Sequence, residues 1–135
     1  MFLFDVIDCA DKVICSHTAV DALKNHLRNL TDEQIKLVIE KGGVVGLTPV
    51  RAFIKGEGRL IDFAQTIDYC AQKFGVEHFC IGTDYYGSTD FDENLSRYEH
   101  FCKLKAELLR FGYKNHDIDA LFWRNAQTLF SQFVK

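Results

Sequence analysis

No stretch of the sequence approaches the roughly 20 consecutive apolar residues that a helix needs to span a bilayer. The N-terminal residues lack the basic cluster that opens a signal peptide and carry Asp5 and Asp8 instead. The 16 basic and 19 acidic residues nearly balance at a net charge of −3, and no basic patch is interleaved with aromatic residues. We therefore expect a soluble protein that binds neither a membrane nor nucleic acid.

The cysteines lack any paired spacing. There are five, an odd number, and none forms a C-x-x-C pair. This usage favours neither a disulfide framework nor a thiolate zinc site, and a thiol-based redox function would need two cysteines close in space. Cys15 and Cys80 fall inside apolar runs, where cysteine behaves as a small hydrophobic residue. The default interpretation is a reduced, cytoplasmic protein.

Several motifs of common enzymes are also missing. The sequence contains no G-x-S-x-G nucleophile elbow, no H-E-x-x-H zinc motif, no P-loop and no G-x-G-x-x-G fingerprint. The sequence therefore gives no support for a serine hydrolase or a nucleotide-binding protein. No repeat, low-complexity tract or linker divides the 135 residues, of which 47% are hydrophobic. We expect residues 1–135 to form a single domain, or part of one, around one core.

What the sequence does contain is an alternation of short apolar runs with helical patterns. The runs cover residues 13–17, 44–48 and 79–84, and each is followed by a segment of helical periodicity. This order predicts βα units, a parallel sheet and an α/β fold. In barrels built from such units, the C-terminal strand ends carry the active site. The chain holds only about three units, whereas a closed (β/α)₈ barrel needs eight.

Helical patterns surround these runs. The first dozen residues have the periodicity of an amphipathic helix. Thr31 and Gln34 fit a capping box, so a helix is expected to begin there and to end at Gly42. Further helices are expected near residues 19–26, over 60–74 and 92–111, and after Asn115. Ile61, Trp123, Phe130 and Phe133 are among the apolar side chains expected in the core.

Three polar residues stand where strands end or connect. His17 ends the first run, and imidazole is the commonest metal ligand, although a lone histidine is more often structural or at the surface. Asp84 ends the third run, where a carboxylate can bind metal or accept a proton, although it can also cap a helix or turn. Arg28 follows the first strand and offers a fork for a carboxylate, or else is a solvated charge. The matching positions of His17 and Asp84 favour a shared site.

These residues lie within longer stretches of recognisable sequence. The stretches are VICSHT (13–18), RNLTDEQI (28–35), KGGVVG (41–46), GVEHFCIGTD (75–84) and ELLRFGY (107–113), followed by Asn125. In this order they resemble the membrane (renal-type) dipeptidase family of zinc peptidases, and the resemblance covers nearly the whole chain.

The resemblance implies the C-terminal portion of a (β/α)₈ TIM barrel of the metal-dependent hydrolase type. Residues 1–135 would hold strands six to eight with their helices. It also implies a binuclear zinc site and hydrolysis of dipeptides by a metal-activated hydroxide. His17 matches the family's metal-binding histidine on the sixth strand, and Arg28 matches the arginine that binds the substrate's C-terminal carboxylate. Asp84 matches the eighth-strand aspartate that handles the proton.

The sequence departs from the family in two ways. Tyr86 stands where the family has a second acid in its Asp-Phe-Asp-Gly motif. The family's first-strand His-x-Asp, bridging glutamate and fifth-strand histidine all precede the matching region and have no counterpart here. We therefore expect a truncated chain, a gene remnant or a fragment, that binds zinc weakly and is inactive or incomplete alone. The alternative is a non-catalytic module that self-associates through exposed sheet edges.

Overall fold

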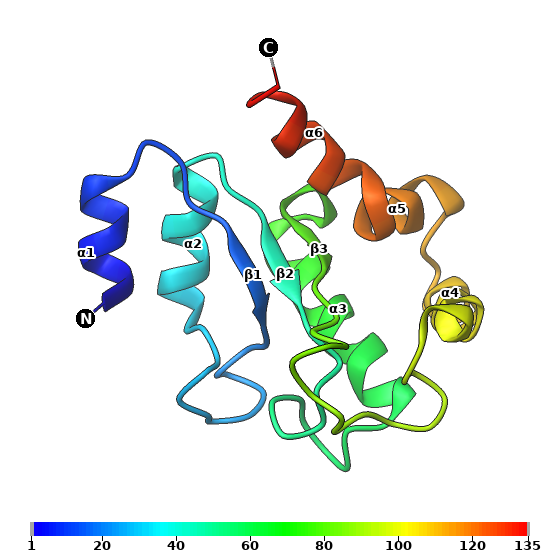
Figure 1. The fold of residues 1–135 in the computed structure, drawn as a ribbon. Coiled ribbons are helices and arrows are strands. Elements are labelled where there is room, and N and C mark those ends of the chain that lie inside the picture. The colour runs from blue at the N-terminus through cyan, green and yellow to red at the C-terminus, as the bar shows by residue number, and fades with distance from the viewer. Residues whose placement is uncertain (1, 135) are drawn as a thin grey trace.

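The computed structural model describes residues 2–134, which contain a three-stranded parallel sheet (Figure 1). The strands β1 (Cys15–Thr18), β2 (Val45–Leu47) and β3 (Phe79–Ile81) lie in the order β1-β2-β3. This arrangement confirms the predicted βα alternation. None of the described helices is long and apolar enough to cross a bilayer.

The α-helices are α1 (Phe2–Cys9), α2 (Asp32–Glu40), α3 (Leu60–Phe74), α4 (Phe101–Arg110), α5 (Asn115–Asp119) and α6 (Asn125–Ser131). Of the shorter elements, η1 (Val76–His78) and η2 (Tyr98–His100) are 3₁₀ turns, and η3 (Ala120–Arg124) is π-helical.

Helices α2 and α3 cover one face of the sheet, and Figure 1 views the other face with the strands in front. The core lies between these layers. Val45, Leu47 and Phe79 of the strands are fully buried, together with Ile35 of α2 and Phe63 of α3. A parallel strand that is buried needs apolar side chains, which explains why the three runs are rich in β-branched and aromatic residues.

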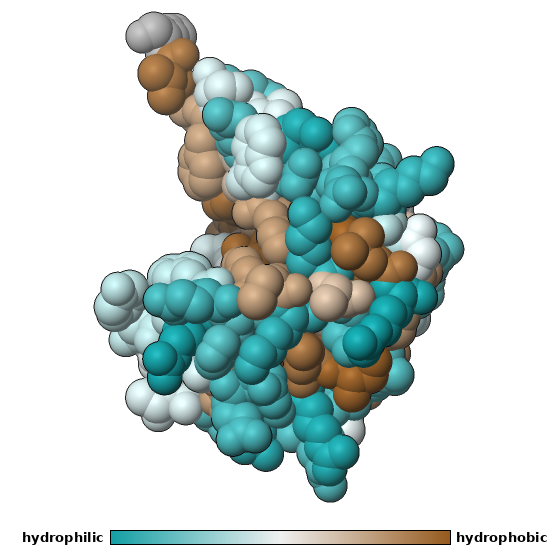
Figure 2. Space-filling model, turned by 90° about the vertical axis from the view of Figure 1, so that its right-hand side faces the viewer, coloured by the Kyte–Doolittle hydropathy of each residue, from teal (hydrophilic) through white to brown (hydrophobic). Residues whose placement is uncertain are grey.

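Four apolar side chains expected in the core lie instead at the surface. Ile61 is 37% exposed, and Trp123, Phe130 and Phe133 are 52%, 54% and 63% exposed. In Figure 2, apolar surface runs along the C-terminal end of the chain and into the hollow below it. Helical periodicity identifies an apolar face but not whether another element covers it, and three strands leave part of these faces uncovered. On α3, Phe63 and Cys70 are buried in place of Ile61.

The ends of α2 follow the predicted signals. Thr31 Oγ1 accepts the Gln34 backbone N–H at 3.3 Å, and the Gln34 side chain accepts the Thr31 N–H at 2.9 Å. This capping box satisfies two N–H groups that have no partner within the helix. At the other end, Gly42 adopts a φ of 67° and Gly43 N–H donates to Val38 C=O at 3.0 Å. The helix therefore turns directly into β2.

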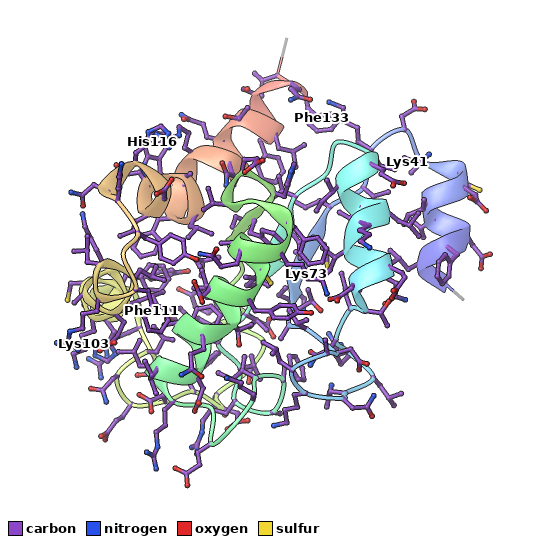
Figure 3. The ribbon with its side chains drawn as sticks, turned by 180° about the vertical axis from the view of Figure 1, so that it is seen from behind. Lys41, Lys73, Lys103, Phe111, His116 and Phe133 are labelled. Atoms are coloured by element: carbon purple, nitrogen blue, oxygen red, sulfur yellow. The ribbon has the colours of Figure 1, made fainter. Side chains whose placement is uncertain are left out.

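A polar cluster joins α2 to α3 on the outer side of the helix layer. Lys73 lies on α3, which stands in front of the sheet when the molecule is seen from behind (Figure 3). Its ammonium group pairs with Asp32 Oδ2, to which the Tyr69 hydroxyl also donates at 2.8 Å. Partial burial raises the pKa of Asp32, but these two donors outweigh it and hold the pKa below its usual range. The cluster thereby links the first turn of α2 to the last turns of α3.

Gly46 and Gly82 leave room for an irregular course of the β1 backbone. Pairing between β2 and β3 is regular, whereas the register between β1 and β2 shifts between Cys15 and Thr18. The backbone carbonyl of Ser16 occupies the space that a Cβ would need at both Gly46 and Gly82. Any larger residue at these two positions would collide with backbone rather than with a movable side chain. The absence of a side chain at both positions therefore sets where Ser16 and the adjacent His17 lie.

Two predicted helices differ in the structure. Residues 21–23 form a turn rather than part of a helix, and Asn29 donates its side-chain amide to Lys24 C=O and Phe53 C=O at 2.8 Å each. A parallel bridge from Val20 to Leu30 closes this loop. The helix expected over residues 92–111 begins only at η2. Residues 93–97 form a turn and bends, at the start of which the Asp92 side chain accepts the Asn94 N–H at 2.7 Å. In both places local side-chain hydrogen bonds compete with the helix.

We expect Gly82→Ala to lower the free energy of unfolding by about 2–3 kcal/mol, because its methyl group would meet the Ser16 carbonyl and displace β1. Gly42→Ala is the comparison, since nothing lies within 4 Å of its added Cβ. Only its left-handed backbone is strained, which costs about 1 kcal/mol. Urea unfolding of the two variants measures the difference. An equal or smaller loss in Gly82→Ala would contradict the close contact.

Candidate functional site

The three polar residues singled out in the sequence meet at the C-terminal ends of the strands. His17 lies in β1, Arg28 in the connection that follows it, and Asp84 three residues after β3. The Arg28 guanidinium donates to His17 Nε2 at 3.3 Å, and Asp84 Oδ2 lies 4.0 Å from the same nitrogen. The side chains of His17 and Asp84 are 31% and 27% exposed, so a ligand can reach both.

The hydrogen bonds of His17 define its tautomer. A guanidinium group has donors only, so Nε2 of His17 must accept from Arg28. The proton of the neutral imidazole then resides on Nδ1, which lies 2.9 Å from the Ser16 hydroxyl oxygen. Ser16 therefore accepts from Nδ1 and orients the ring. Ser16 was not singled out in the sequence, and its position next to His17 was the one signal that pointed to it.

Arg28 is held in place through its backbone. Its carbonyl accepts from the Thr18 hydroxyl at 2.8 Å, and its N–H donates to His26 Nδ1 at 3.1 Å. The guanidinium lies 5.7 Å from the centroid of the Phe53 ring, which also contacts the His26 ring at 4.7 Å. Thr18 is 1% exposed and carries this hydrogen bond at the end of β1. The backbone of Arg28 is thus tied down while its side chain remains exposed.

Asp84 has an unusual backbone that aims its carboxylate. Its φ is 57°, the left-handed region, which aspartate tolerates better than most residues. Its carbonyl accepts the N–H groups of Gly87 and Ser88 at 3.0 Å each, which closes a tight turn. The Asp84 carboxylate occupies the space where a Cβ of Gly87 would lie. The glycine of this turn therefore leaves room for the carboxylate.

The two tyrosines after Asp84 have opposite surroundings. The Tyr85 hydroxyl donates to Leu95 C=O at 2.8 Å, and its ring meets Phe91 and Tyr98 edge-on at 5.0 Å each. Burial raises the pKa of Tyr85 to about 12, so this hydroxyl remains a donor at neutral pH. Tyr86 is 99% exposed. Tyr85 anchors the loop, and Tyr86 extends from it into solvent.

The donors present here match a metal ion in kind but not in number. An imidazole nitrogen and a carboxylate oxygen are both zinc ligands, but a catalytic zinc takes about three ligands from protein. Within residues 2–134, no group of three or more histidine, cysteine or acidic side chains is arranged to hold a metal ion. The lone pair of His17 Nε2 is also occupied by Arg28. The described residues do not complete a metal site by themselves.

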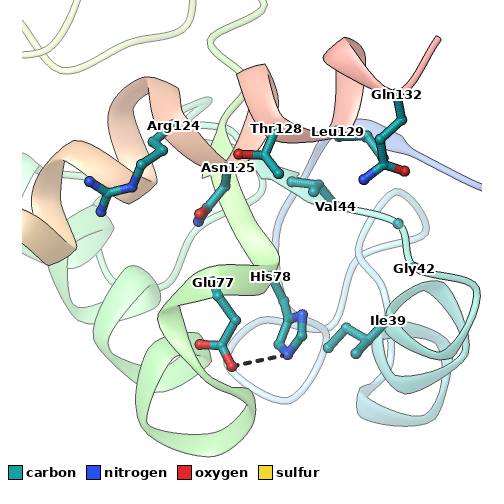
Figure 4. Close-up of a pocket in the computed structure, with 11 residues that line it drawn as sticks. Ile39, Gly42, Val44, Glu77, His78, Arg124, Asn125, Thr128, Leu129 and Gln132 are labelled. Atoms are coloured by element: carbon teal, nitrogen blue, oxygen red, sulfur yellow. Dashed lines mark ion pairs between the residues drawn. The ribbon is translucent and has the colours of Figure 1, made fainter.

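A hollow of about 310 Å³ lies at the opposite end of the sheet (Figure 4). The end of α2, η1 and α6 line it, and His78 pairs there with Glu77 at 3.4 Å. Asn125 donates its amide to Val76 C=O and Phe79 C=O at 2.8 Å each. Asn125 therefore fixes the start of β3 against α6. This end of the sheet carries helix packing rather than the residues predicted for a site.

Comparison with known proteins places the chain in a family. Residues 2–134 match the model of the membrane dipeptidase family, peptidase family M19. The chain belongs to this family. Family members are dipeptidases and metallopeptidases, so the family assignment confirms the resemblance that the sequence motifs carry.

Among curated relatives of this dipeptidase-family chain, an uncharacterised protein of Klebsiella pneumoniae, from the region 5′ of pqqA, is 34% identical over 119 residues. That match covers 84% of this chain and 44% of the relative. Dipeptidase verJ of Clonostachys rogersoniana is 29% identical over 114 residues, covering 84% of this chain and 29% of the relative. The chain therefore spans less than half the length of these relatives.

Solved structures show the same fold. A metallopeptidase from Rhodobacter sphaeroides, bound to a phosphinate mimic of the dipeptide L-Ala-D-Ala, superposes with a TM-score of 0.87 at 24% identity. The match covers 96% of this chain and 38% of that structure. An amidohydrolase from Pseudomonas aeruginosa matches with a TM-score of 0.78 at 25% identity, over 90% of this chain and 46% of that structure. The three-stranded α/β unit is thus one portion of a TIM-barrel-type fold.

We expect Thr18→Val to loosen Arg28 while costing only about 1 kcal/mol of stability, because it removes one hydrogen bond and keeps the side-chain shape. Thr66→Val is the matched control. Thr66 is also 1% exposed, and its hydroxyl donates to Asp62 C=O within α3. NMR should show shifted His17 ring resonances in Thr18→Val alone. Unchanged His17 resonances in Thr18→Val would show that the Thr18 hydrogen bond does not position Arg28 against His17.

Proposed function

We propose that this chain supplies the C-terminal part of the active site of a zinc-dependent dipeptidase. The observation that carries the proposal is the convergence of three functional groups in a chain of the dipeptidase family. The imidazole of His17, the guanidinium of Arg28 and the carboxylate of Asp84 lie together at the C-terminal ends of the strands. Both the guanidinium and the carboxylate are within 4.0 Å of His17 Nε2. Parallel strands of this fold present their active-site residues at this edge.

Each residue has a distinct proposed function. Arg28 binds the C-terminal carboxylate of the dipeptide, since its planar fork suits a carboxylate and it is exposed on the rim. Asp84 accepts and returns the proton during hydrolysis, because its carboxylate is the acidic group closest to His17. His17 provides an imidazole nitrogen for a metal ion, with Ser16 fixing the ring.

The zinc site requires ligands beyond those described here. Because His17 and Asp84 are fewer than the roughly three protein ligands of a catalytic zinc, other barrel strands would have to provide the remainder. The curated relatives are more than twice as long as the matched segment, which supports this arrangement. The contribution proposed for this chain is therefore to bind the substrate carboxylate, to transfer the proton and to offer one imidazole donor.

The proposal predicts three different defects in a longer polypeptide that joins this segment to the remaining barrel strands. Arg28→Ala should raise KM for dipeptides about ten- to a hundredfold, since a charge-assisted hydrogen bond is worth about 1.5–3 kcal/mol. Asp84→Asn should retain metal but reduce turnover, and His17→Ala should lower the occupancy of one metal. Metal content and steady-state kinetics distinguish the three. Arg97→Ala is the control for loss of an exposed positive charge.

Two outcomes would contradict the proposal. An unchanged KM in Arg28→Ala would remove the carboxylate-binding assignment, and full turnover in Asp84→Asn would remove the proton-transfer assignment. The 135-residue chain alone, supplied with zinc, should hydrolyse dipeptides poorly or not at all. Tight binding of two zinc ions with robust turnover by this chain would show that the donor set has been misread.

A second candidate function is supported by the open sheet. Within the described residues, β1 and β3 each pair with β2 and with no other strand, so both edges have unpaired backbone groups. Ile14, beside β1, is 43% exposed and lines a small hollow with Phe130 and Phe133. Such edges and apolar side chains favour pairing with another chain. The chain would then act as an assembly module, with or without catalysis.

This second candidate predicts self-association that depends on concentration. Ile14→Lys should shift the chain toward monomer, because it places a charge in the apolar hollow beside the open edge of β1. Leu109→Lys is a matched control, since Leu109 is 45% exposed but lies on α4, away from that edge. Light scattering across a range of concentrations measures both. A monomer at every concentration in the unmodified chain would exclude the assembly function.

A further inference from the structure

Thr48 lies between the two strand ends that carry the candidate site. It follows β2 directly and is fully buried, at 0% exposed. Its backbone N–H donates to Thr18 C=O at 2.8 Å, and its hydroxyl donates to Thr83 C=O at 3.3 Å. Thr18 is the residue after His17, and Thr83 is the residue before Asp84. One buried residue therefore bonds to the chain neighbours of both His17 and Asp84.

The hydroxyl of Thr48 connects β2 to β3 beyond the point where their backbones pair. Regular pairing of the two strands ends at Leu47. Pro49 follows Thr48 and has no N–H, so this residue cannot donate a ladder hydrogen bond to β3. The Thr48 hydroxyl extends the connection by donating to Thr83 C=O. The hydroxyl oxygen also accepts the Val50 N–H at 3.5 Å, which fixes the direction in which its own proton points.

The hydroxyl bond to Thr83 controls the backbone of Asp84. The Thr83 carbonyl belongs to the rigid peptide plane that leads into Asp84, and the φ of Asp84 is the rotation that follows this plane. That φ is 57°, in the left-handed region that is costly for a residue with a Cβ. The Asp84 carbonyl then closes a turn by accepting the N–H groups of Gly87 and Ser88 at 3.0 Å each. A fixed Thr83 peptide group therefore holds this strained residue, and with it the carboxylate 4.0 Å from His17 Nε2.

We propose that Thr48 is a positioning residue, whose hydroxyl sets the orientation of the Asp84 carboxylate toward His17. The Thr48 side chain is buried and acts through Thr83, so it is not itself a catalytic residue. A change of this side chain leaves the backbone N–H that bonds Thr18, so the links to the two strand ends can be separated. The inference rests on the proposed function for its effect on turnover, whereas the geometric link depends on contacts within the chain alone.

Amide proton exchange in the full 135-residue chain, measured by NMR, tests the link. The amides of Gly87 and Ser88, called here the turn amides, report the turn that Asp84 closes. The amide of Gly82, called the sheet amide, donates to Leu47 C=O at 2.9 Å and reports the pairing of β2 with β3. A local effect on Asp84 changes exchange of the turn amides alone, whereas a general loss of stability changes both.

Three variants separate the Thr48 hydroxyl from general stability. Thr48→Val removes the hydroxyl and keeps the side-chain shape, and Thr48→Ser retains the hydroxyl. Thr66→Val removes another buried hydroxyl, which bonds Asp62 C=O within α3. Exchange of the turn amides should be about fivefold faster in Thr48→Val, because one hydrogen bond is lost, and unchanged in the other two variants. The sheet amide should exchange at the unmodified rate in all three.

Several results would overturn the proposal. Turn amides that keep the unmodified rate in Thr48→Val, or that stay fast in Thr48→Ser, would remove the role of the hydroxyl. Equal acceleration of the sheet amide in Thr48→Val, as global unfolding gives, would show a general loss of stability instead. Acceleration of the turn amides by Thr66→Val would show the same.

Kinetics provide a second measurement in a longer polypeptide that joins this segment to the remaining barrel strands. Thr48→Val should lower kcat for dipeptides and leave KM nearly unchanged, because Asp84 is released while Thr18 stays bonded. Thr48→Ser should restore kcat. An unchanged kcat in Thr48→Val would contradict the positioning role. Absence of activity in the unmodified polypeptide would contradict the proposed function, and the amide exchange then decides the role of Thr48 by itself.

Discussion

The close contact of the Ser16 carbonyl with Gly46 and Gly82 is the constraint on which the candidate site depends. It lets β1 depart from regular pairing between Cys15 and Thr18, and His17 lies within that departure. Thr18, the next residue, anchors the backbone of Arg28. A side chain at either glycine would collide with the Ser16 carbonyl, next to His17. The geometry of the site therefore depends on two glycines as well as on its polar groups.

One guanidinium, one imidazole and one carboxylate form the polar core of the candidate site. The guanidinium supplies a positive charge that the imidazole faces, and the carboxylate lies 4.0 Å from the same imidazole nitrogen. The backbone of Arg28 is held by two hydrogen bonds, while the residue is exposed. A guanidinium can donate either to an imidazole nitrogen or to a carboxylate, because both contacts use only its N–H donors.

The open sheet explains why several large apolar side chains remain at the surface. In a barrel, each strand is paired on both sides, whereas here β2 alone has two neighbours among the described strands. Phe130 and Phe133 line a hollow beside the start of β1 rather than a closed core. The solved structures that match this chain extend well beyond the matched portion.

The sequence by itself determined the order of the strands and of most helices. Apolar runs separated by helical patterns predicted a parallel α/β unit, the Thr31–Gln34 capping box predicted the start of α2, and the dipeptidase motifs identified the family. These signals are local, because caps and periodicity depend on residues a few positions apart. The non-helical structure near residues 19–26 was not predicted, because the Asn29 amide donates a hydrogen bond to the carbonyl of Phe53, which is distant in sequence.

Only the tertiary structure decided which polar groups touch. Strand ends predicted that His17 and Asp84 share an edge, but the donation from Arg28 to Nε2, the resulting tautomer and the Phe53 surface depend on how loops fold back on the sheet. The exposure of Trp123, Phe130 and Phe133 was likewise decided there. Periodicity tells which face of a helix is apolar, whereas burial depends on whether a distant element packs against that face.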